Sequence, residues 1–225
     1  HFFPENNVTT SFSYFREPKL YERHPVMNKG GAVKLWKVPK TSEIIALIDS
    51  ELMIKTAVHF PMHLKLNVKI DNDDSVNERD SSLYDPRFFL PLFSQLCATG
   101  SYVDRHLPLI ECGALALVFA SLSSCDETMR SAGYTVLARL YAQFEGAKLS
   151  AEKKVWLHLI DCVRFGVVDS RSGKTTALRI PSLVTVFLVR ATIILRNPLD
   201  PMYKPVSNFI LAKPALDLFG VPEFL

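Results

Sequence analysis

The sequence predicts a mainly α-helical fold with a small β-containing part at its N-terminus. Apolar residues make up 48% of the 225 residues and charged residues 22%, a composition that excludes a largely disordered chain. From residue 83 onward, apolar side chains recur three and four positions apart, which is the period of a helix with one buried face. Before residue 83 the pattern is mixed. We therefore expect a mixed N-terminal segment over residues 1–82 and a helical domain over residues 83–225.

Short strands and one helix are expected in the N-terminal segment. Residues 8–15 and 32–38 are rich in β-branched and aromatic side chains, which favour an extended backbone. Residues 41–54 begin with hydroxyl side chains that can cap a helix and continue with apolar side chains at helical spacing. Residues 63–70 alternate between polar and apolar side chains, which predicts a strand with one buried face. The acidic stretch 71–82 predicts a solvated loop at the boundary.

Six helices are expected in the C-terminal domain. The Asp85–Pro86 pair supplies an N-cap followed by a proline in the first turn, which is a typical helix start. The apolar stretch from Pro181 to Leu195 is expected to be a buried helix. In chain order the six helices cover about residues 86–99, 104–122, 124–144, 150–167, 181–196 and 206–212.

The succession of helices predicts an armadillo- or HEAT-like helical stack of the kind that ends an α-solenoid. Such stacks are built from consecutive helices that have apolar surfaces on two sides and short connections. The sequence shows no sharp internal repeat, so a compact helical bundle is the alternative.

Composition excludes several functional classes. The net charge of +3 is too small to indicate nucleic-acid binding by bulk charge. The longest apolar stretch is shorter than the ~20 residues that span a bilayer, so no membrane contact is expected.

The chain begins at His1, and we expect it to be part of a longer protein. Four cysteines fit no zinc or disulfide framework and are expected to be free thiols: Cys97, Cys112, Cys125 and Cys162.

Two local patterns resemble catalytic motifs but lack the residues that would complete them. Gly173 and Lys174 resemble the end of a phosphate-binding loop, but Val168 occupies the position of the glycine that such a loop needs. His59 and His63 have a metal-ligand spacing, but a proline lies between them and no glutamate follows the first, as a zinc protease requires. We therefore expect no enzyme, no metal site and no cofactor.

Local charge is more informative than the total. Residues 164–213 contain eight basic and two acidic residues, and residues 16–40 contain seven basic and two acidic residues with aromatic side chains between them. Such clusters suit phosphate groups, because each neutralised phosphate releases a counterion, and aromatic rings can stack on bases. A solvated face or contact with an acidic protein is the equal alternative. The candidate RNA- or partner-binding residues are Arg164, Arg171, Lys174, Arg179, Arg196 and Lys204, with a second basic-aromatic patch at Lys29, Lys34, Trp36 and Lys37.

Five short motifs in a fixed order resemble one known family. They are YDPRF at residues 84–88, ECGALAL at 111–117, YTVLAR at 134–139, NPLDPMY at 197–203, and a closing run with LAKPALDL and VPEF within 211–224. Their order and spacing resemble the C-terminal domain of the nucleolar pre-ribosomal-associated protein 1 family. The resemblance covers about two thirds of the chain and carries no catalytic residues with it.

The resemblance implies a nuclear, nucleolar protein that is a very large scaffold of helical repeats. It implies a role in large ribosomal subunit assembly and pre-ribosomal RNA processing, together with other assembly factors that include a DEAD-box helicase and small nucleolar ribonucleoproteins. Our working hypothesis is a non-catalytic scaffold domain that contacts pre-ribosomal RNA through its basic face. The alternative is a protein-docking module that binds other assembly factors without direct RNA contact.

Overall fold

A computed structural model describes residues 41–67, 83–98, 106–145, 151–166 and 177–212 of the chain. Within these ranges the backbone forms helices and no strand, so the prediction of a mainly α-helical fold is confirmed. The helices are α1 (Thr41–Ala46), α2 (Ser50–Val58), α3 (Pro86–Ala98), α4 (His106–Glu111), α5 (Ala114–Ser121), α6 (Glu127–Glu145), α7 (Ala151–Gly166), α8 (Ser182–Arg196) and α9 (Tyr203–Ala212).

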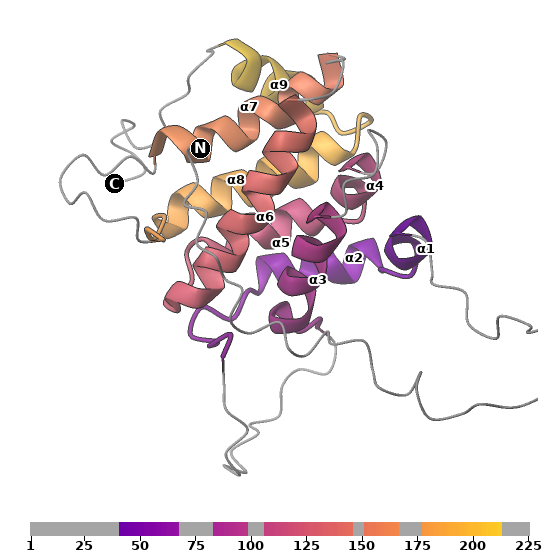
Figure 1. Cartoon of the computed structure of the whole chain (residues 1–225). Helices are drawn as coiled ribbons and strands as arrows, with labels where there is room; N and C mark the ends of the chain where they lie inside the picture. The colour runs from indigo at the N-terminus through magenta and orange to yellow at the C-terminus, as the bar shows by residue number, and fades with distance from the viewer. Residues whose placement is uncertain (1–40, 68–82, 99–105, 146–150, 167–176, 213–225) are drawn as a thin grey trace, which may run out of the picture.

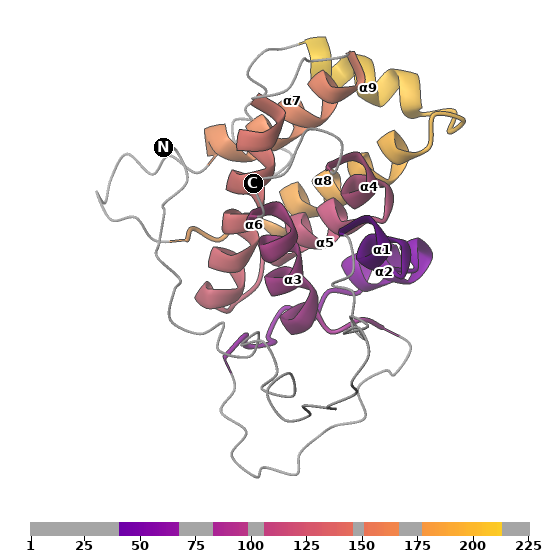
Figure 2. The ribbon, with the colours of Figure 1, turned by 45° about the vertical axis from the view of Figure 1, so that its right-hand side comes forward.

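Helix α5 lies at the centre of the core. All eight of its residues are buried, as expected for a helix whose surface is apolar on every side. Helices α2 and α8 both pack against α5, and α6 also packs against it with α3 lying along α6 (Figure 1). The turned view in Figure 2 shows α7 and α9 at one end of the molecule and α1 and α2 toward the other. One buried core therefore includes residues on both sides of the predicted boundary at residue 82, and the division into two domains stays a prediction.

Most of the predicted helix starts are confirmed. Helix α3 begins at Pro86, and the carbonyl of Asp85 accepts hydrogen bonds from Phe88 and Phe89. Asp126 precedes α6 and accepts a hydrogen bond from the backbone of Met129, which is the geometry of an N-cap. Helices α7 and α8 match the predicted ranges to within one residue at each end, whereas α9 begins at Tyr203, three residues before its predicted start.

The predicted continuous helix over residues 104–122 is wrong. The chain forms α4 and α5 instead, and Gly113 between them has a φ of +86°. The N–H of Gly113 donates to the carbonyl of Ile110 at 2.9 Å and closes α4, while its own carbonyl accepts from Ala116 at 3.1 Å and opens α5. A side chain at this position would also contact Met53 and Ile54 of α2, so glycine permits both the break and the close approach of α2.

The predicted single helix over residues 41–54 is also divided. Its two pieces are α1 and α2, and Asp49 lies between them as the N-cap of α2. One carboxylate oxygen of Asp49 accepts hydrogen bonds from the backbone of Glu51 and Leu52. The N–H of Asp49 donates to the hydroxyl of Tyr84 at 3.0 Å, a partner 35 positions away. The break therefore depends on a tertiary contact as well as on the local capping residue.

The predicted strand over residues 63–70 is wrong for residues 63–67, and residues 68–70 lie outside the described part. The expected alternation is present, because Leu64 and Leu66 are half-buried while His63 and Lys65 are exposed. The described ranges offer no neighbouring strand, and the backbone N–H of Leu66 instead donates to the carboxylate of Asp126 at 3.0 Å. The alternation thus identified the buried side of an extended segment but not its hydrogen-bond partners.

The small β-containing part is not found among the described residues. The strands predicted over residues 8–15 and 32–38 lie outside them, as do the acidic stretch 71–82 and most of the polar loop 169–179. None of the described helices has the length and apolar character needed to cross a bilayer.

Candidate docking groove and basic surface

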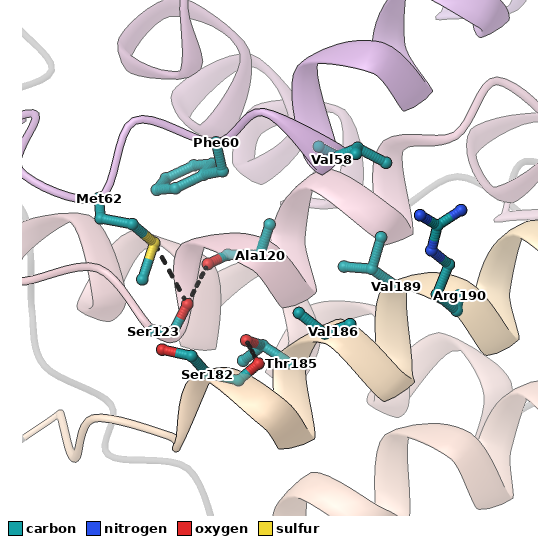
Figure 3. Close-up of a pocket in the computed structure, with 11 residues that line it drawn as sticks. Val58, Phe60, Met62, Ala120, Ser123, Ser182, Thr185, Val186, Val189 and Arg190 are labelled. Atoms are coloured by element: carbon teal, nitrogen blue, oxygen red, sulfur yellow. Dashed lines mark hydrogen bonds between the residues drawn. The ribbon is translucent and has the colours of Figure 1, made fainter.

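An open groove of about 420 Å³ lies between the end of α2, the end of α5 and the first half of α8 (Figure 3). We call it the α2–α8 groove. Val58, Phe60 and Met62 form one wall and Ala120 and Ser123 form the floor. The opposite wall is a stripe of α8: Ser182, Thr185, Val186, Val189 and Arg190.

The spacing of residues along α8 explains why this wall faces the groove. Ser182, Val186 and Arg190 are four positions apart, so they lie above one another on one face of the helix. The start of α8 is attached to the end of α5, because the backbone N–H of Ile180 donates to the carbonyl of Leu122 at 3.0 Å. One wall of the groove is therefore regular helix, and it is held to the buried floor.

Two of the three hydroxyl groups that line the groove, those of Ser123 and Thr185, donate hydrogen bonds inside the protein. The hydroxyl of Ser123 donates to the carbonyl of Ala120 at 3.0 Å, and the hydroxyl of Thr185 donates to the carbonyl of Ser182 at 2.8 Å. The sulfur of Met62 lies 3.5 Å from the hydroxyl of Ser123. With these hydroxyl groups occupied, the groove presents a largely apolar surface to solvent.

The rim of the groove exposes apolar side chains. Val58 is 42% exposed and Val186 is 56% exposed, and Leu183 on the adjacent face of α8 is 55% exposed. The prediction that residues 181–195 form a buried helix is therefore correct for only one side of α8. Arg190, which interrupts the apolar run, was the sequence signal for an outward face.

Three of the candidate basic residues have described side chains: Arg179, Arg196 and Lys204. The partly buried Arg196 forms an ion pair with Glu51 at 3.0 Å and donates to the carbonyl of Glu111 at 3.2 Å. It joins α8 to α2 and α4. Arg179 is exposed, and its Nε donates to the carbonyl of Ser123 at 2.8 Å. Lys204 is exposed on α9.

Two of these cations lie at opposite ends of one helix. Helix α8 has 15 residues, which corresponds to a length of about 22 Å. Arg179 lies three positions before the first residue of α8, and Arg196 is its last residue. They cannot contact the same phosphate group, although both could lie along one extended nucleic acid.

The remaining candidate residues fall outside what the structure describes. Arg164 lies in the last turn of α7, but its side chain is not among those described. Arg171 and Lys174 lie outside the described residues. The same is true of the whole basic-aromatic patch: Lys29, Lys34, Trp36 and Lys37.

The four cysteines are free thiols, as predicted. Cys97, Cys112 and Cys162 are buried, and burial raises their pKa values to about 12, about 11 and about 12. Cys125 is exposed. Within the described ranges no group of three or more histidine, cysteine and acidic residues has the arrangement of a metal site.

Comparison with known proteins identifies the family. A family model described as Nucleolar pre-ribosomal-associated protein 1 matches residues 115–225. The chain is 34% identical over 214 residues to Nucleolar pre-ribosomal-associated protein 1 of Mus musculus, and 32% identical over 212 residues to that of Homo sapiens. The chain belongs to the nucleolar pre-ribosomal-associated protein 1 family.

The match extends the resemblance seen in the sequence motifs. Each pairwise alignment covers 92% of this chain, so much of the N-terminal segment also belongs to the region of similarity. The chain spans 9% of the length of these two relatives. No solved structure matches it significantly. The family is nucleolar, and its name describes an association with pre-ribosomes and not a reaction.

Proposed function

We propose that the chain is a non-catalytic scaffold domain that docks a protein partner within the pre-ribosome during large-subunit assembly. The observation that carries this proposal is the α2–α8 groove, whose lining exposes Val58 and Val186, with Leu183 also exposed on α8. Contiguous apolar surface left exposed at a groove is typical of a protein-interaction or ligand-binding site. The nucleolar family supplies the cellular setting.

The groove chemistry favours binding over catalysis. Its lining contains no histidine, cysteine, aspartate or glutamate among the described residues. The two hydroxyl groups of Ser123 and Thr185 donate to backbone carbonyls, so neither is paired with a base that would make it a nucleophile.

The helix arrangement supports a scaffold role. Helices α2, α5 and α8 pack in succession, and α3 packs along α6 beside them. We interpret these two rows as part of an armadillo-like stack, in which successive helices present one long surface. The α2–α8 groove lies between the two outer helices of the first row and is open to a segment of another assembly factor. The resemblance implies a DEAD-box helicase and small nucleolar ribonucleoproteins as candidates.

A photo-crosslinking amino acid at Leu183 of the full-length protein tests the proposal. Leu183 is exposed beside the groove, and we expect a protein crosslink in purified pre-ribosomes that Val186→Asp abolishes. The same crosslinker at Ala142, which is exposed on α6, is the matched control. Equal protein crosslinks from both positions, or crosslinks to RNA alone, would contradict docking through this groove.

RNA contact through the basic residues is the second candidate function. It is supported by the exposure of Arg179 and Lys204 within a region of eight basic and two acidic residues. Replacing both by glutamine should weaken binding to a large-subunit rRNA fragment and lower the salt slope by about two, one for each phosphate that is no longer neutralised. An unchanged slope in a folded double variant would remove these two residues from the RNA hypothesis.

A further inference from the structure

We propose that the α2–α8 groove binds an amphipathic helix of a partner protein, and that an acidic side chain of this helix pairs with Arg190. The proposal rests on the docking function above and adds the chemistry of the partner. Three properties of the groove carry it: its described lining contains no strand edge, Val186 and Arg190 lie one turn apart on α8, and Arg190 has no partner within the described part of the chain.

The walls of the groove favour a helical occupant. An extended peptide binds best at a sheet edge, where backbone groups are available for hydrogen bonds. Here Val58 is the last residue of α2 and the opposite wall belongs to α8, while the segment that carries Phe60 and Met62 is not a strand. The carbonyl of Met62 already accepts a hydrogen bond from the N–H of Cys125 at 2.8 Å, so the described lining offers no sheet edge. Recognition must come from side chains, and an amphipathic helix supplies them on one face.

The positions of the apolar and charged groups define the register of the occupant. Val186 and Arg190 are four residues apart on α8, which separates them by about 6 Å or one helical turn. A helix that lies along α8 with an apolar side chain on Val186 therefore places its residues three or four positions away beside Arg190. An acidic residue one turn from the apolar anchor matches this spacing.

Arg190 is the charged residue of the groove lining, and its guanidinium extends from α8 toward the side of the groove where Val58 lies (Figure 3). Within the described part of the chain Arg190 has no hydrogen-bond or ion-pair partner, whereas Arg196 on the same helix is paired with Glu51. Helix α8 contains no acidic residue that could neutralise it. A lone cation beside apolar walls suits one carboxylate on an apolar surface better than the repeated phosphates of RNA.

A matched pair of labelled peptides tests the charge and the register. Both are amphipathic helices of about 16 residues, long enough to hold a helical face on binding. They share one apolar stripe and carry either glutamate or lysine one turn from its central leucine. Fluorescence anisotropy with the 225-residue chain at low salt should give about tenfold tighter binding of the glutamate peptide.

Substitutions in the chain locate the effect. Arg190→Glu should reverse the preference to favour the lysine peptide, because it exchanges attraction for repulsion. Val186→Asp should abolish binding of both peptides, and Val186 is exposed enough for this variant to fold. Lys154→Glu, at an exposed position of α7, is the matched charge reversal away from the groove and should leave the preference unchanged. Circular dichroism and thermal melting confirm folding of each variant.

Four results would overturn the inference. They are equal affinity for the two peptides, a preference that survives Arg190→Glu, absence of binding by the folded chain, and tighter binding of a short single-stranded RNA that Val186→Asp removes. If the Leu183 crosslink to a protein in pre-ribosomes still depends on Val186 while the peptides show no charge preference, docking stands and the acidic-helix inference fails. If the crosslink is also absent, both fail.

Discussion

At Gly133, helix α6 lies close against the end of α5. A Cβ atom built there would collide with the hydroxyl of Ser121 and come within 3.1 Å of a methyl group of Leu122. Both neighbours are fully buried, and a close-packed interior has little room to give.

Replacing Gly133 by alanine is expected to destabilise the fold by about 1–2 kcal/mol. The overpacking cost exceeds the gain of about 1 kcal/mol in helix propensity. Urea unfolding of the single variant, of Ser121→Ala and of the double variant measures this. The double variant should cost less than the sum of the two singles, because removing the Ser121 hydroxyl removes the nearest obstacle. Additive costs would show that the contact is not the cause.

Asp126 is expected to make stability depend on pH. Partial burial is the largest influence and raises its pKa, but hydrogen bonds from Leu66, Thr128 and Met129, with the charge of Arg130, together lower the pKa below its usual value. A carboxyl with a lowered folded pKa contributes stability that is present above its unfolded pKa of about 3.9 and is lost as the pH falls through the folded value.

Two variants separate the charge of Asp126 from its capping role. Asp126→Asn removes the charge and keeps an oxygen, so its stability deficit at neutral pH should shrink below about pH 4. Asp126→Ala also removes the cap and should cost about 0.5–2 kcal/mol more at neutral pH. Denaturant unfolding at several pH values measures both. A deficit of Asp126→Asn that does not change with pH would contradict the assignment.

At the scale of the elements, Arg130 of α6 connects two other segments, the α5–α6 turn and the segment before α8. Its Nε donates to the carbonyl of Ala177 at 2.8 Å, and its Nη1 donates to the carbonyls of Ser124 and Cys125 at 2.9 and 3.0 Å. These bonds hold the segment before α8 against the α5–α6 turn, next to the hydrogen bond of Ile180 that anchors one groove wall.

Arg130→Met is expected to lower the unfolding free energy by about 2 kcal/mol, because it removes hydrogen bonds from a charged donor. It should also speed amide hydrogen exchange at Ile180. Arg139→Met is the matched control, since Arg139 on the same helix donates to Ser94 of α3 and not to the segment before α8. Hydrogen exchange by mass spectrometry should show faster exchange at Ile180 in the first variant and not in the second. The same change in both would contradict a local role for Arg130.

Element starts were predictable where one or two residues specify them, as with Asp85–Pro86 before α3. Element breaks were not, because Asp49 is fixed by Tyr84 and Gly113 lies against α2. The extended segment after α2 shows the same division. Its buried side was readable from alternation, but its hydrogen-bond partner, Asp126, is 60 positions away from Leu66.

At the scale of the whole molecule, burial should separate the four cysteines into two classes. Cys125 is exposed, while Cys97, Cys112 and Cys162 are buried with raised pKa values, and a thiol reacts as its thiolate. Titration of the native chain with a disulfide reagent should therefore give one fast thiol, and four after unfolding. Cys125→Ser should abolish the fast phase. Two or more fast thiols would show that the core opens under native conditions.

The docking groove is also a property of the whole molecule. Its lining comes from α2, the segment after it, the end of α5 and the start of α8. The candidate site residues chosen from charge alone did not include Val58, Val186 or Arg190. Arg196, which was included, is instead part of an ion pair with Glu51, a residue 145 positions away.

The sequence by itself determined the helical class, most helix starts, the free thiols and the family. These depend on capping residues and apolar spacing within a few positions, or on short motifs in order. Only the tertiary structure decided where the long helices break, which side of α8 stays uncovered, and which arginine is paired. The reason is that exposure and pairing depend on what packs against a residue, and for Val186, Arg190 and Arg196 those neighbours come from distant parts of the chain.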